Sequence, residues 1–525
     1  MAERRVPLDG SDRAPPEGAT LVGDVDPDEP VSVVVHVKRR TRDNFAPGSA
    51  GDLARFAKPI TRRALASQRR RTHARAMARI VKLAAEKKLT VGRNDPVQRT
   101  VELSGTARQM AETFGATLRI YDDGQRRFRV RVGRLMVPAG IAPWTRAVLG
   151  FDQRPLAPPV EMKSLAGEGA GKGLWPTDIA ALYGVPLDGD MSSVRVGIVA
   201  LGGGYLASDL TAALAGMNRA PPVVVDVPVD GNGNNFGNGS TADQEIALDL
   251  QVLAALLPKA HIAVYFAGNT AASLTGAIHQ AVFDDVNRPQ VISVSWGSAE
   301  KFWTEAGRDA MQSVLADAQR LRIAVLFAAG DELATGGLSD GKVHVWFPAS
   351  SPYALGCGGT KPVLAADKGS IVSEAVWNEG FGGGTGGGIS DVFPVPAYQS
   401  QLNLPKSVND GAVRRGVPDV ACAAASTPGY RIVVNGVEVA KDGTSAATPL
   451  WAALIAMAHV ARGEPISLLN SALYANQAAF RPIAQGNNRF HGKGYDAGPG
   501  WNACTGLGVP KGAALIAALA TVPVA

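Results

Sequence analysis

The segment VRVGIVALGGG, residues 194–204, decides the fold of this chain. It reads as an apolar strand that runs into three glycines. Three more apolar runs of strand length follow it: AHIAVYFAG (260–268), QVISVSWGS (290–298) and IAVLFAAGD (323–331). Strands that are apolar on both faces are typical of a parallel sheet covered by helices on each side. Each run ends in Gly, Ser or Asp, and ligands of such sheets bind at the carboxyl ends of the strands.

Helical patterns separate these strands, for example TADQEIALDLQVLAALL (241–257) and SLTGAIHQAVF (273–283). Alternating strands and helices predict an α/β domain, which we assign to residues 176–525.

The first part of the chain follows a different pattern. Residues 1–30 are rich in Pro, Gly and acidic side chains and are predicted to be a loose tail. Residues 31–152 contain the strand VSVVVHV (31–37) and an Arg-rich helix from about residue 52 to 88, and they are predicted to form one small α+β domain. Residues 153–175 have the Pro, Gly and small-residue composition of a linker that a protease can reach.

Charge is unevenly distributed between these parts. Residues 1–170 hold 31 Lys and Arg against 19 Asp and Glu, a net charge of +12, whereas the remainder of the chain carries −6. A basic segment joined to an acidic one can bind it electrostatically. The alternative for the basic part is nucleic-acid binding, but no recognised motif for it accompanies the charge.

Other whole-chain signals exclude several classes. The three cysteines, Cys357, Cys422 and Cys504, fit neither a zinc site nor a CxxC motif, and they are predicted to be buried apolar residues with at most one disulfide. No apolar run approaches the ~18 residues of a membrane span. The N-terminus has no hydrophobic stretch after its charges, so export would use a route other than a conventional signal peptide.

The sharpest chemical signal is DGTSAATPLWAALIAMAHVA, residues 442–461. Ser445 lies at the start of an apolar helix, where the helix dipole and free backbone N–H groups can stabilise an oxyanion. The alternative is that Ser445 only caps the helix.

A nucleophilic serine needs a base, and carboxylates are better candidates than histidines here. None of the seven histidines has the Gly/Thr context of a subtilisin-type catalytic histidine, although a Ser-His-Asp triad stays an alternative. Glu245 and Asp249 are four residues apart on one face of an apolar helix, where proximity and burial raise the pKa of at least one of them. Asp331 directly follows an apolar strand, where a protonated carboxyl could donate to an oxyanion. The structural alternative for Glu245 and Asp249 is a solvated helix edge, and the alternative for Asp331 is an aspartate in a turn.

Gly-rich loops recur at residues 201–205, 295–298 and 380–390. Glycine lets the backbone approach an extended ligand, which suits a cleft that pairs with a peptide strand. A dinucleotide site is the alternative, but the GxGxxG pattern is absent.

Ten short segments together resemble the sedolisins, or serine-carboxyl peptidases, and most closely those of the kumamolisin type. In chain order they are ALGGGY, the Glu245–Asp249 helix, ISVSWG, AAGD, FPASSPYALGCGGT, VWNEG, GGGISDVFP, RRGVPDVA, GTSAATP and AGPGWNACTGLGVP. The resemblance spans nearly the whole chain and implies a subtilisin-like peptidase domain preceded by a basic activation prodomain.

The resemblance also implies a role for each matching residue. Ser445 matches the nucleophile, Glu245 the general base and acid, and Asp249 the acid that orients it. Asp331 matches the oxyanion-hole aspartate. Trp296 matches a tryptophan beside the catalytic glutamate, and we place Trp296 and Gly297 in the substrate cleft.

Two departures from the family pattern stand out. Kumamolisin-type members carry an extra acid where this chain has Ala200. The family also binds Ca²⁺ near the C-terminus through two aspartates and backbone carbonyls, which here would be those of Ile483, Gly498 and Gly500. The aspartate positions hold Pro482 and Asn502, so we expect no tightly bound calcium and no other metal, with Asp496 as the nearest substitute acid.

These observations predict a zymogen of an endopeptidase that acts in acid through an acyl-enzyme on Ser445 and cleaves its own linker. We expect a secreted monomer whose partners are peptide substrates and its own prodomain as inhibitor and chaperone, without nucleic acid or membrane. A neutral-pH Ser-His-Asp subtilase and a catalytically silent binding protein on the same fold are the alternatives.

Overall fold

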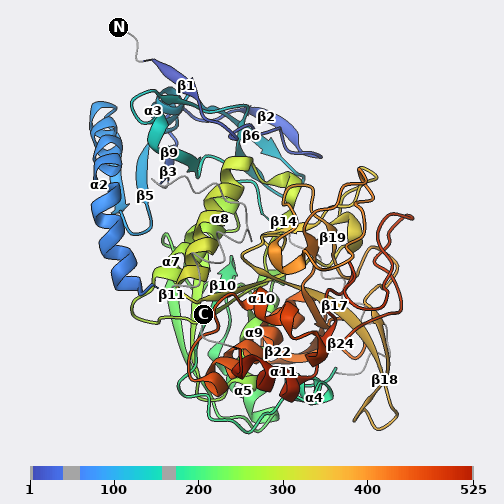
Figure 1. Cartoon of the computed structure of the whole chain (residues 1–525). Helices are drawn as coiled ribbons and strands as arrows, with labels where there is room; N and C mark the ends of the chain where they lie inside the picture. The colour runs from blue at the N-terminus through green and yellow to red at the C-terminus, as the bar shows by residue number, and fades with distance from the viewer. Residues whose placement is uncertain (1–3, 39–59, 157–172, 523–525) are drawn as a thin grey trace.

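The computed structural model describes residues 4–38, 60–156 and 173–522, and Figure 1 shows two packed units. The larger unit is built on a sheet of eight strands, seven of them in the order β11-β12-β10-β13-β15-β17-β18, with β21 also paired to β17. All neighbours pair in parallel except β17 and β18. The strands are β10 (Arg195–Leu201), β11 (Val223–Pro228), β12 (His261–Ala267), β13 (Val291–Val294), β15 (Ala324–Ala328), β17 (Leu355–Leu364), β18 (Ile371–Val376) and β21 (Val420–Ala423).

Helices cover both faces of this sheet, as the apolar strands predict. Along β10, Ile198 faces one apolar core and Val199 the other. The first core lies beneath α4 (Pro176–Leu182), α5 (Ala207–Gly216), α6 (Thr241–Leu256), α9 (Thr444–Arg462), α10 (Leu469–Ala475) and α11 (Gly512–Ala520). The second lies beneath α7 (Ala271–Phe283) and α8 (Glu305–Arg320). The predicted parallel α/β sheet is therefore confirmed.

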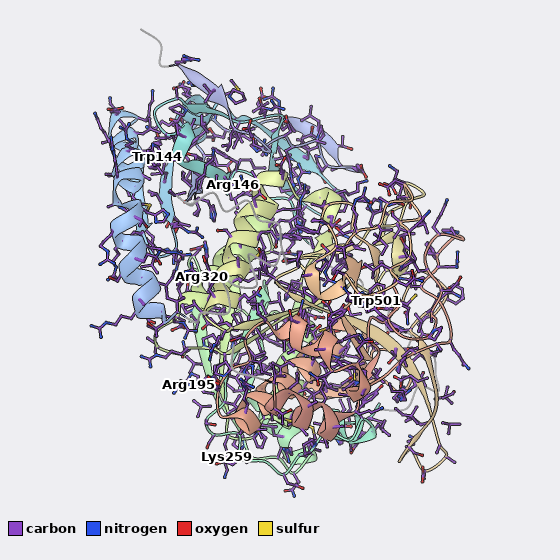
Figure 2. The ribbon with its side chains drawn as sticks, viewed as in Figure 1. Trp144, Arg146, Arg195, Lys259, Arg320 and Trp501 are labelled. Atoms are coloured by element: carbon purple, nitrogen blue, oxygen red, sulfur yellow. The ribbon has the colours of Figure 1, made fainter. Side chains whose placement is uncertain are left out.

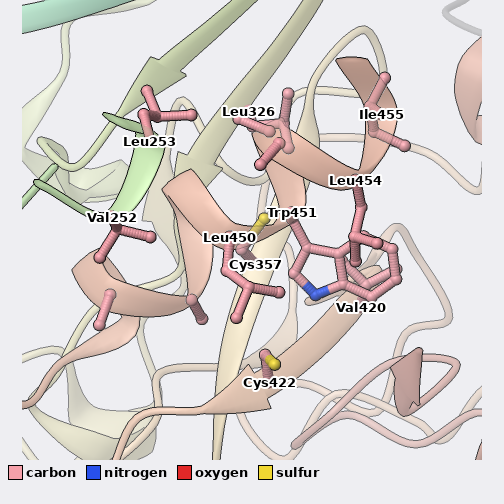
Figure 3. Packing of buried hydrophobic residues seen from close by; sticks show 14 of the residues in the cluster. Val252, Leu253, Leu326, Cys357, Val420, Cys422, Leu450, Trp451, Leu454 and Ile455 are labelled. Carbon is pink, nitrogen blue, oxygen red and sulfur yellow. The ribbon is translucent and has the colours of Figure 1, made fainter. Parts of the chain in front are cut away.

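Helix α9 runs through the first core. Trp451 is fully buried on it, donates a hydrogen bond from its indole to the Ala421 carbonyl, and packs among strand residues that include Cys357 and Val420 (Figure 3). By length and composition α9 is the one helix of the described residues that could cross a membrane, but 89% of its apolar window is buried inside the protein. It is therefore a core helix. The three cysteines are buried and none forms a disulfide.

The smaller unit is the α+β domain expected near the N-terminus. Its four-stranded antiparallel sheet has the order β4-β5-β3-β9, and a three-stranded sheet has the order β2-β6-β7. Helix α2 (Arg62–Glu86) and helix α3 (Ala107–Phe114) accompany them. The strands are β1 (Arg5–Pro7), β2 (Thr20–Asp24), β3 (Pro30–Val37), β4 (Thr90–Asp95), β5 (Thr100–Thr106), β6 (Thr117–Asp122), β7 (Arg127–Val132), β8 (Met136–Pro138) and β9 (Thr145–Leu149).

The prediction of a loose tail over residues 1–30 is wrong for its described part. β1 pairs with β8 and β2 pairs with β6, each antiparallel. Arg13 also forms an ion pair with Asp152 and donates to the Phe302 carbonyl of the larger unit. Composition predicted disorder because the segment cannot bury much surface alone, but strand partners from far along the chain supply its backbone hydrogen bonds.

The linker is described only at its ends. Leu156 packs in the second core of the larger unit, and Leu174 bridges to Tyr430 on β22 (Tyr430–Val434). Most of the predicted processing segment, residues 157–172, lies outside the described residues. The helix expected from about residue 52 to 88 is α2, which begins at Arg62 after the cap Thr61 and ends at Glu86; residues 52–59 lie outside the described residues.

Candidate active site

Ser445 lies in the first turn of α9, as predicted. Gly443 caps the helix with φ +114°, a conformation that L side chains rarely adopt. A Cβ on Gly443 would stand 2.8 Å from Oδ2 of Asp331, so the turn also needs a residue without a side chain. Ser445 is 5% exposed, at the helix end where unpaired N–H groups collect.

Glu245 and Asp249 are both buried on α6, whose start is fixed by a capping box between Ser240 and Asp243. Asp243 also accepts from the backbone N–H of Gly204, which ties the first glycine-rich loop to this helix. The i,i+4 spacing therefore puts two carboxylates side by side in the core rather than at a solvated edge.

Ser295 connects this carboxyl pair to α9. It follows β13, donates a 2.7 Å hydrogen bond to Oδ1 of Asp249, and lies 3.4 Å from the Ser445 carbonyl oxygen. Ser295 was not predicted from the sequence. The available signal was a hydroxyl at the carboxyl end of an otherwise apolar strand.

Burial dominates the electrostatics of the pair. It raises the pKa of Glu245 to about 8, while hydrogen bonding by Ser445 opposes the shift and the nearby charge of Asp331 adds to it. Burial also raises the pKa of Asp249 well above its usual value, and the charge of Glu245 adds to this, whereas the hydrogen bond from Ser295 opposes it. Burial therefore favours the protonated form of both carboxyls, and the charge that each would place on the other opposes the ionisation of both at once.

Asp331 lies three residues beyond β15 and faces the start of α9. Its Oδ1 accepts from both the backbone N–H and the hydroxyl of Thr444, each at 2.7 Å, and the Thr444 hydroxyl in turn accepts from the Gly330 N–H at 3.2 Å. Burial raises the pKa of Asp331, and the two bonds from Thr444 oppose it. The other oxygen, Oδ2, is left to carry a proton on the side of Gly443.

The structure thus brings Ser445, Glu245, Asp249 and Asp331 together at the carboxyl end of the sheet, and it adds Ser295 and Thr444. Trp296 and Gly297 directly follow Ser295 and are buried. The indole nitrogen of Trp296 has no hydrogen-bond partner among the described residues, and Gly297 packs against Trp346 and the Phe347 carbonyl. Their place in the substrate cleft stays a prediction.

All seven histidines lie in the described part of the chain, and no hydrogen bond joins any of them to Ser445 there. His459 shares α9 with Ser445, but fourteen residues of helix separate them by about 21 Å. His261 pairs with Asn287 and His344 with Asp340.

The residues at the family's calcium position do not fit a cation. The side-chain nitrogen Nδ2 of Asn502 donates to the Ile483 carbonyl at 3.0 Å and lies 3.5 Å from the Gly498 carbonyl. Its Oδ1 accepts from the backbone N–H groups of Cys504 and Thr505 and from the Thr505 hydroxyl. Three donors fix the orientation of the amide, so N–H groups point at the carbonyls that would otherwise bind the metal.

Asp496 does not replace the lost carboxylates. It forms a two-pronged ion pair with Arg489, at 2.8 and 2.6 Å. Among the described residues no group of three His, Cys, Asp or Glu side chains is placed to hold a metal ion.

Comparison with known proteins agrees with the fold and the two-unit organisation. Residues 17–154 match the family model described as the pro-kumamolisin activation domain, and residues 231–471 match the subtilase family. Kumamolisin from Bacillus sp. (strain MN-32) is 40% identical over 538 aligned residues, which cover 98% of this chain and 96% of that protein.

More distant relatives extend the same similarity. Sedolisin from Pseudomonas sp. (strain 101) is 28% identical over 87% of this chain and 80% of its own length. The solved structure of Pseudomonas sedolisin, a serine-carboxyl proteinase complexed with pseudo-iodotyrostatin, superposes with a TM-score of 0.57 at 28% identity, over 66% of this chain and 97% of that one.

Proposed function

The chain belongs to the sedolisin family of serine-carboxyl peptidases, as a kumamolisin-like zymogen with an activation prodomain, and from this we propose that Ser445 is its nucleophile, Glu245 its base and Asp331 its oxyanion donor. The observation that carries the proposal is the buried Glu245–Asp249 pair, in which Glu245 is hydrogen-bonded to the Ser445 side chain and Asp249 accepts from Ser295.

The reaction is an acyl transfer. Glu245 takes the Oγ proton as Ser445 attacks the peptide carbonyl, and it then gives that proton to the leaving amine as the C–N bond breaks. Water hydrolyses the acyl-enzyme with Glu245 again as base. Asp249, fixed by Ser295, orients Glu245 and holds the proton that the pair keeps in its active form.

Asp331 stabilises the oxyanion in its protonated form. The two hydrogen bonds from Thr444 fix its Oδ1, so the O–H lies on Oδ2, toward the start of α9. Together with the Ser445 backbone N–H it stabilises charge that develops in the transition state.

This chemistry is acid-acting, because the roles of Asp331 and the Glu245–Asp249 pair both depend on protons. Activity rises as the pair loses its first proton and falls when Asp331 loses its own. Since burial raises the pKa of Asp331, the alkaline limb lies above the usual aspartate range, and we expect activity below neutrality.

The prodomain acts as an intramolecular inhibitor that is removed by self-cleavage in the 153–175 linker. The predicted charge complementarity supports this. Arg93 pairs with Asp230 at 2.8 Å, and Arg146, labelled in Figure 2, pairs with Asp309 of α8. The mature enzyme is proposed to be an extracellular monomer that cleaves peptides without a tightly bound metal, nucleic acid or membrane.

Peptidase activity against pH tests the assignment, using acid-treated wild type, Ser445→Ala and Glu245→Gln. Both variants should lose at least about 10³-fold in kcat while keeping wild-type circular dichroism. Asp209→Asn, which alters a buried acid on α5 outside the site, is the matched control and should keep its activity. Substantial turnover by Glu245→Gln, or a limb near pH 6.5 that is typical of histidine, would refute the carboxyl base.

A further inference from the structure

A second group of buried titratable side chains lies between the prodomain and the peptidase unit, away from the active site. Strand β9 of the prodomain packs on α8, where Ala147 lies among Ala306 and Ala310. Figure 1 shows α7 and α8 on the side of the peptidase unit that faces the prodomain. The proposed mechanism uses none of the side chains described next.

One aspartate of the peptidase unit binds two arginines of the prodomain. Asp317 on α8 is fully buried and forms ion pairs with Arg69 of α2 and with Arg99, which precedes β5, the latter at 3.0 Å. Arg99 also donates to the Ser313 hydroxyl at 2.6 Å. Both arginine side chains are at most 5% exposed, so the three charges depend on one another for neutralisation.

Two histidines stack across the same interface. The rings of His36, on β3, and His279, on α7, lie 5.7 Å apart between centroids with an interplanar angle of 22°. They are 7% and 3% exposed, and the Nε2 of His279 has no hydrogen-bond partner among the described residues. The Phe283 ring also lies against His279, 6.1 Å away between centroids and tilted by 57°.

We propose that the interface cluster, defined as His36, His279, Arg69, Arg99 and Asp317, is an acid-sensitive switch that holds the prodomain at neutral pH and releases it in acid. The proposal rests on the proposed function only in that prodomain release activates the peptidase. Among the described titratable groups nearby, His73 on α2 lies beside Arg69, with its Nδ1 3.3 Å from the Arg69 carbonyl oxygen.

Charge explains why acid opens this interface. When both histidines are neutral, the five side chains of the interface cluster carry a net charge of +1. When both histidines are protonated, the net charge is +3, and the cluster is buried and contains one aspartate. Two imidazolium rings cannot stay stacked there without a nearby anion for each.

The direction of the pH dependence follows from the bound and released states. Burial, and then the charge of Arg99, lowers the pKa of His36 in the intact zymogen to about 4, whereas an exposed histidine titrates near 6.5. Burial, and then the charges of His36 and Arg99, lowers the pKa of His279 well below its usual value. The interface is therefore fully stable above about pH 6.5 and weakens as the pH falls toward 4.

The size of the effect follows by linkage. Each unit of pKa difference weakens association tenfold, so His36 alone contributes up to about 300-fold by pH 4, and His279 adds to it. Removing one histidine should shift the pH midpoint of prodomain cleavage downward by about 0.5–1 unit.

The test compares the full-length chain with His36→Gln, His279→Gln and His279→Phe, the last chosen to keep a ring that can stack on His36. The midpoint of precursor cleavage against pH is followed by gel, and the pH profile of the mature enzyme is measured on a peptide. We expect lower cleavage midpoints with an unchanged mature profile. His459→Gln, which removes a histidine that is equally buried but lies in α9, should leave the midpoint unchanged.

A second readout needs no peptidase activity and so separates failure of the switch from failure of the proposed function. Hydrogen exchange of the α7 amides is compared at pH 7 and pH 4 in Ser445→Ala, with and without both His→Gln changes. The switch predicts that the α7 amides of the Ser445→Ala parent lose much of their exchange protection at pH 4, and that those of the variant with both His→Gln changes lose much less. Equal loss in both, or cleavage midpoints that stay at the wild-type pH, would overturn it.

Discussion

Asn502→Asp places a carboxylate where the resemblance to the sedolisins implies a calcium ligand, and we expect it to make this enzyme both less stable and dependent on calcium. In the wild type the amide Nδ2 donates to the Ile483 carbonyl at 3.0 Å and contacts the Gly498 carbonyl at 3.5 Å. A carboxylate cannot donate. It would place negative charge against two carbonyl oxygens in a side chain that is 6% exposed.

The cost can be estimated from these contacts. Losing the hydrogen bond costs about 1 kcal/mol, and leaving buried acceptors unpaired costs a further ~1–3 kcal/mol. The total of about 2–4 kcal/mol corresponds to a fall in Tm of roughly 3–6 °C for a domain of about 350 residues. Added Ca²⁺ at 100 times its Kd would return about 2.7 kcal/mol.

Thermal unfolding of the Ser445→Ala chain avoids self-digestion and measures this directly, with EGTA or with increasing Ca²⁺. The wild-type Asn502 chain should have one Tm in both conditions, and Asn502→Asp should start lower and rise with calcium. Asn502→Ala is the control without a charge: it loses the bonds that Nδ2 donates and also the three that Oδ1 accepts, so it should be less stable than the wild type and should not respond to calcium. A wild-type Tm that drops in EGTA would refute the assignment of the amide as the replacement for the metal.

Three further outcomes follow from the active site. Asp331→Ala should lower kcat by about 10²–10³ with little change in KM. Asp331→Asn donates a hydrogen bond without a titrating proton, so it should move the alkaline limb of the pH–rate profile to higher pH. An alkaline limb that stays in place would contradict the oxyanion role. Ser295→Ala should move the acid limb of the pH–rate profile upward by up to about one pH unit, because it removes a hydrogen bond that lowers the pKa of Asp249. Ser295→Thr keeps the hydroxyl and should restore the wild-type profile. Gly443→Ala should lower both Tm and kcat, because its φ and the 2.8 Å approach to Asp331 leave no room for a Cβ, and a fully active variant would show that the turn relaxes.

The sequence predicted the sheet because its strands carry their signal locally. Runs such as residues 291–294 and 324–328 are apolar on both faces, which few structures other than a covered parallel strand accommodate. It failed over residues 1–30, where β1 and β2 exist only because β8 and β6 pair with them. No local pattern in a polar, Pro-rich segment predicts that strands far along the chain will pair with it.

The same distinction applies to the functional sites. Glu245 and Asp249 were predictable, since helical spacing alone puts them on one face. Ser295 was not, because its contact with Asp249 depends on how α6 packs against the end of β13. The stacking of His36 on His279 depends on the docking of two domains. The substitution at Asn502 was visible in the sequence, but the direction of its amide was set by Cys504 and Thr505.

In the proposed mechanism, protonation acts in the same direction at Asp331 and at the stacked histidines, whereas the Glu245–Asp249 pair must lose a proton for activity. At neutral pH Asp331 would lose the proton that its oxyanion role requires, and the proposed switch would keep the histidines neutral and the prodomain in place. A fall in pH protonates both sites, although they lie in different parts of the molecule and share no side chain. Two independent proton requirements in series make activation steeper in pH than either alone, because the active fraction is the product of two titrations. A peptidase arranged in this way stays inactive at neutral pH even when a fraction of its prodomain is released by chance.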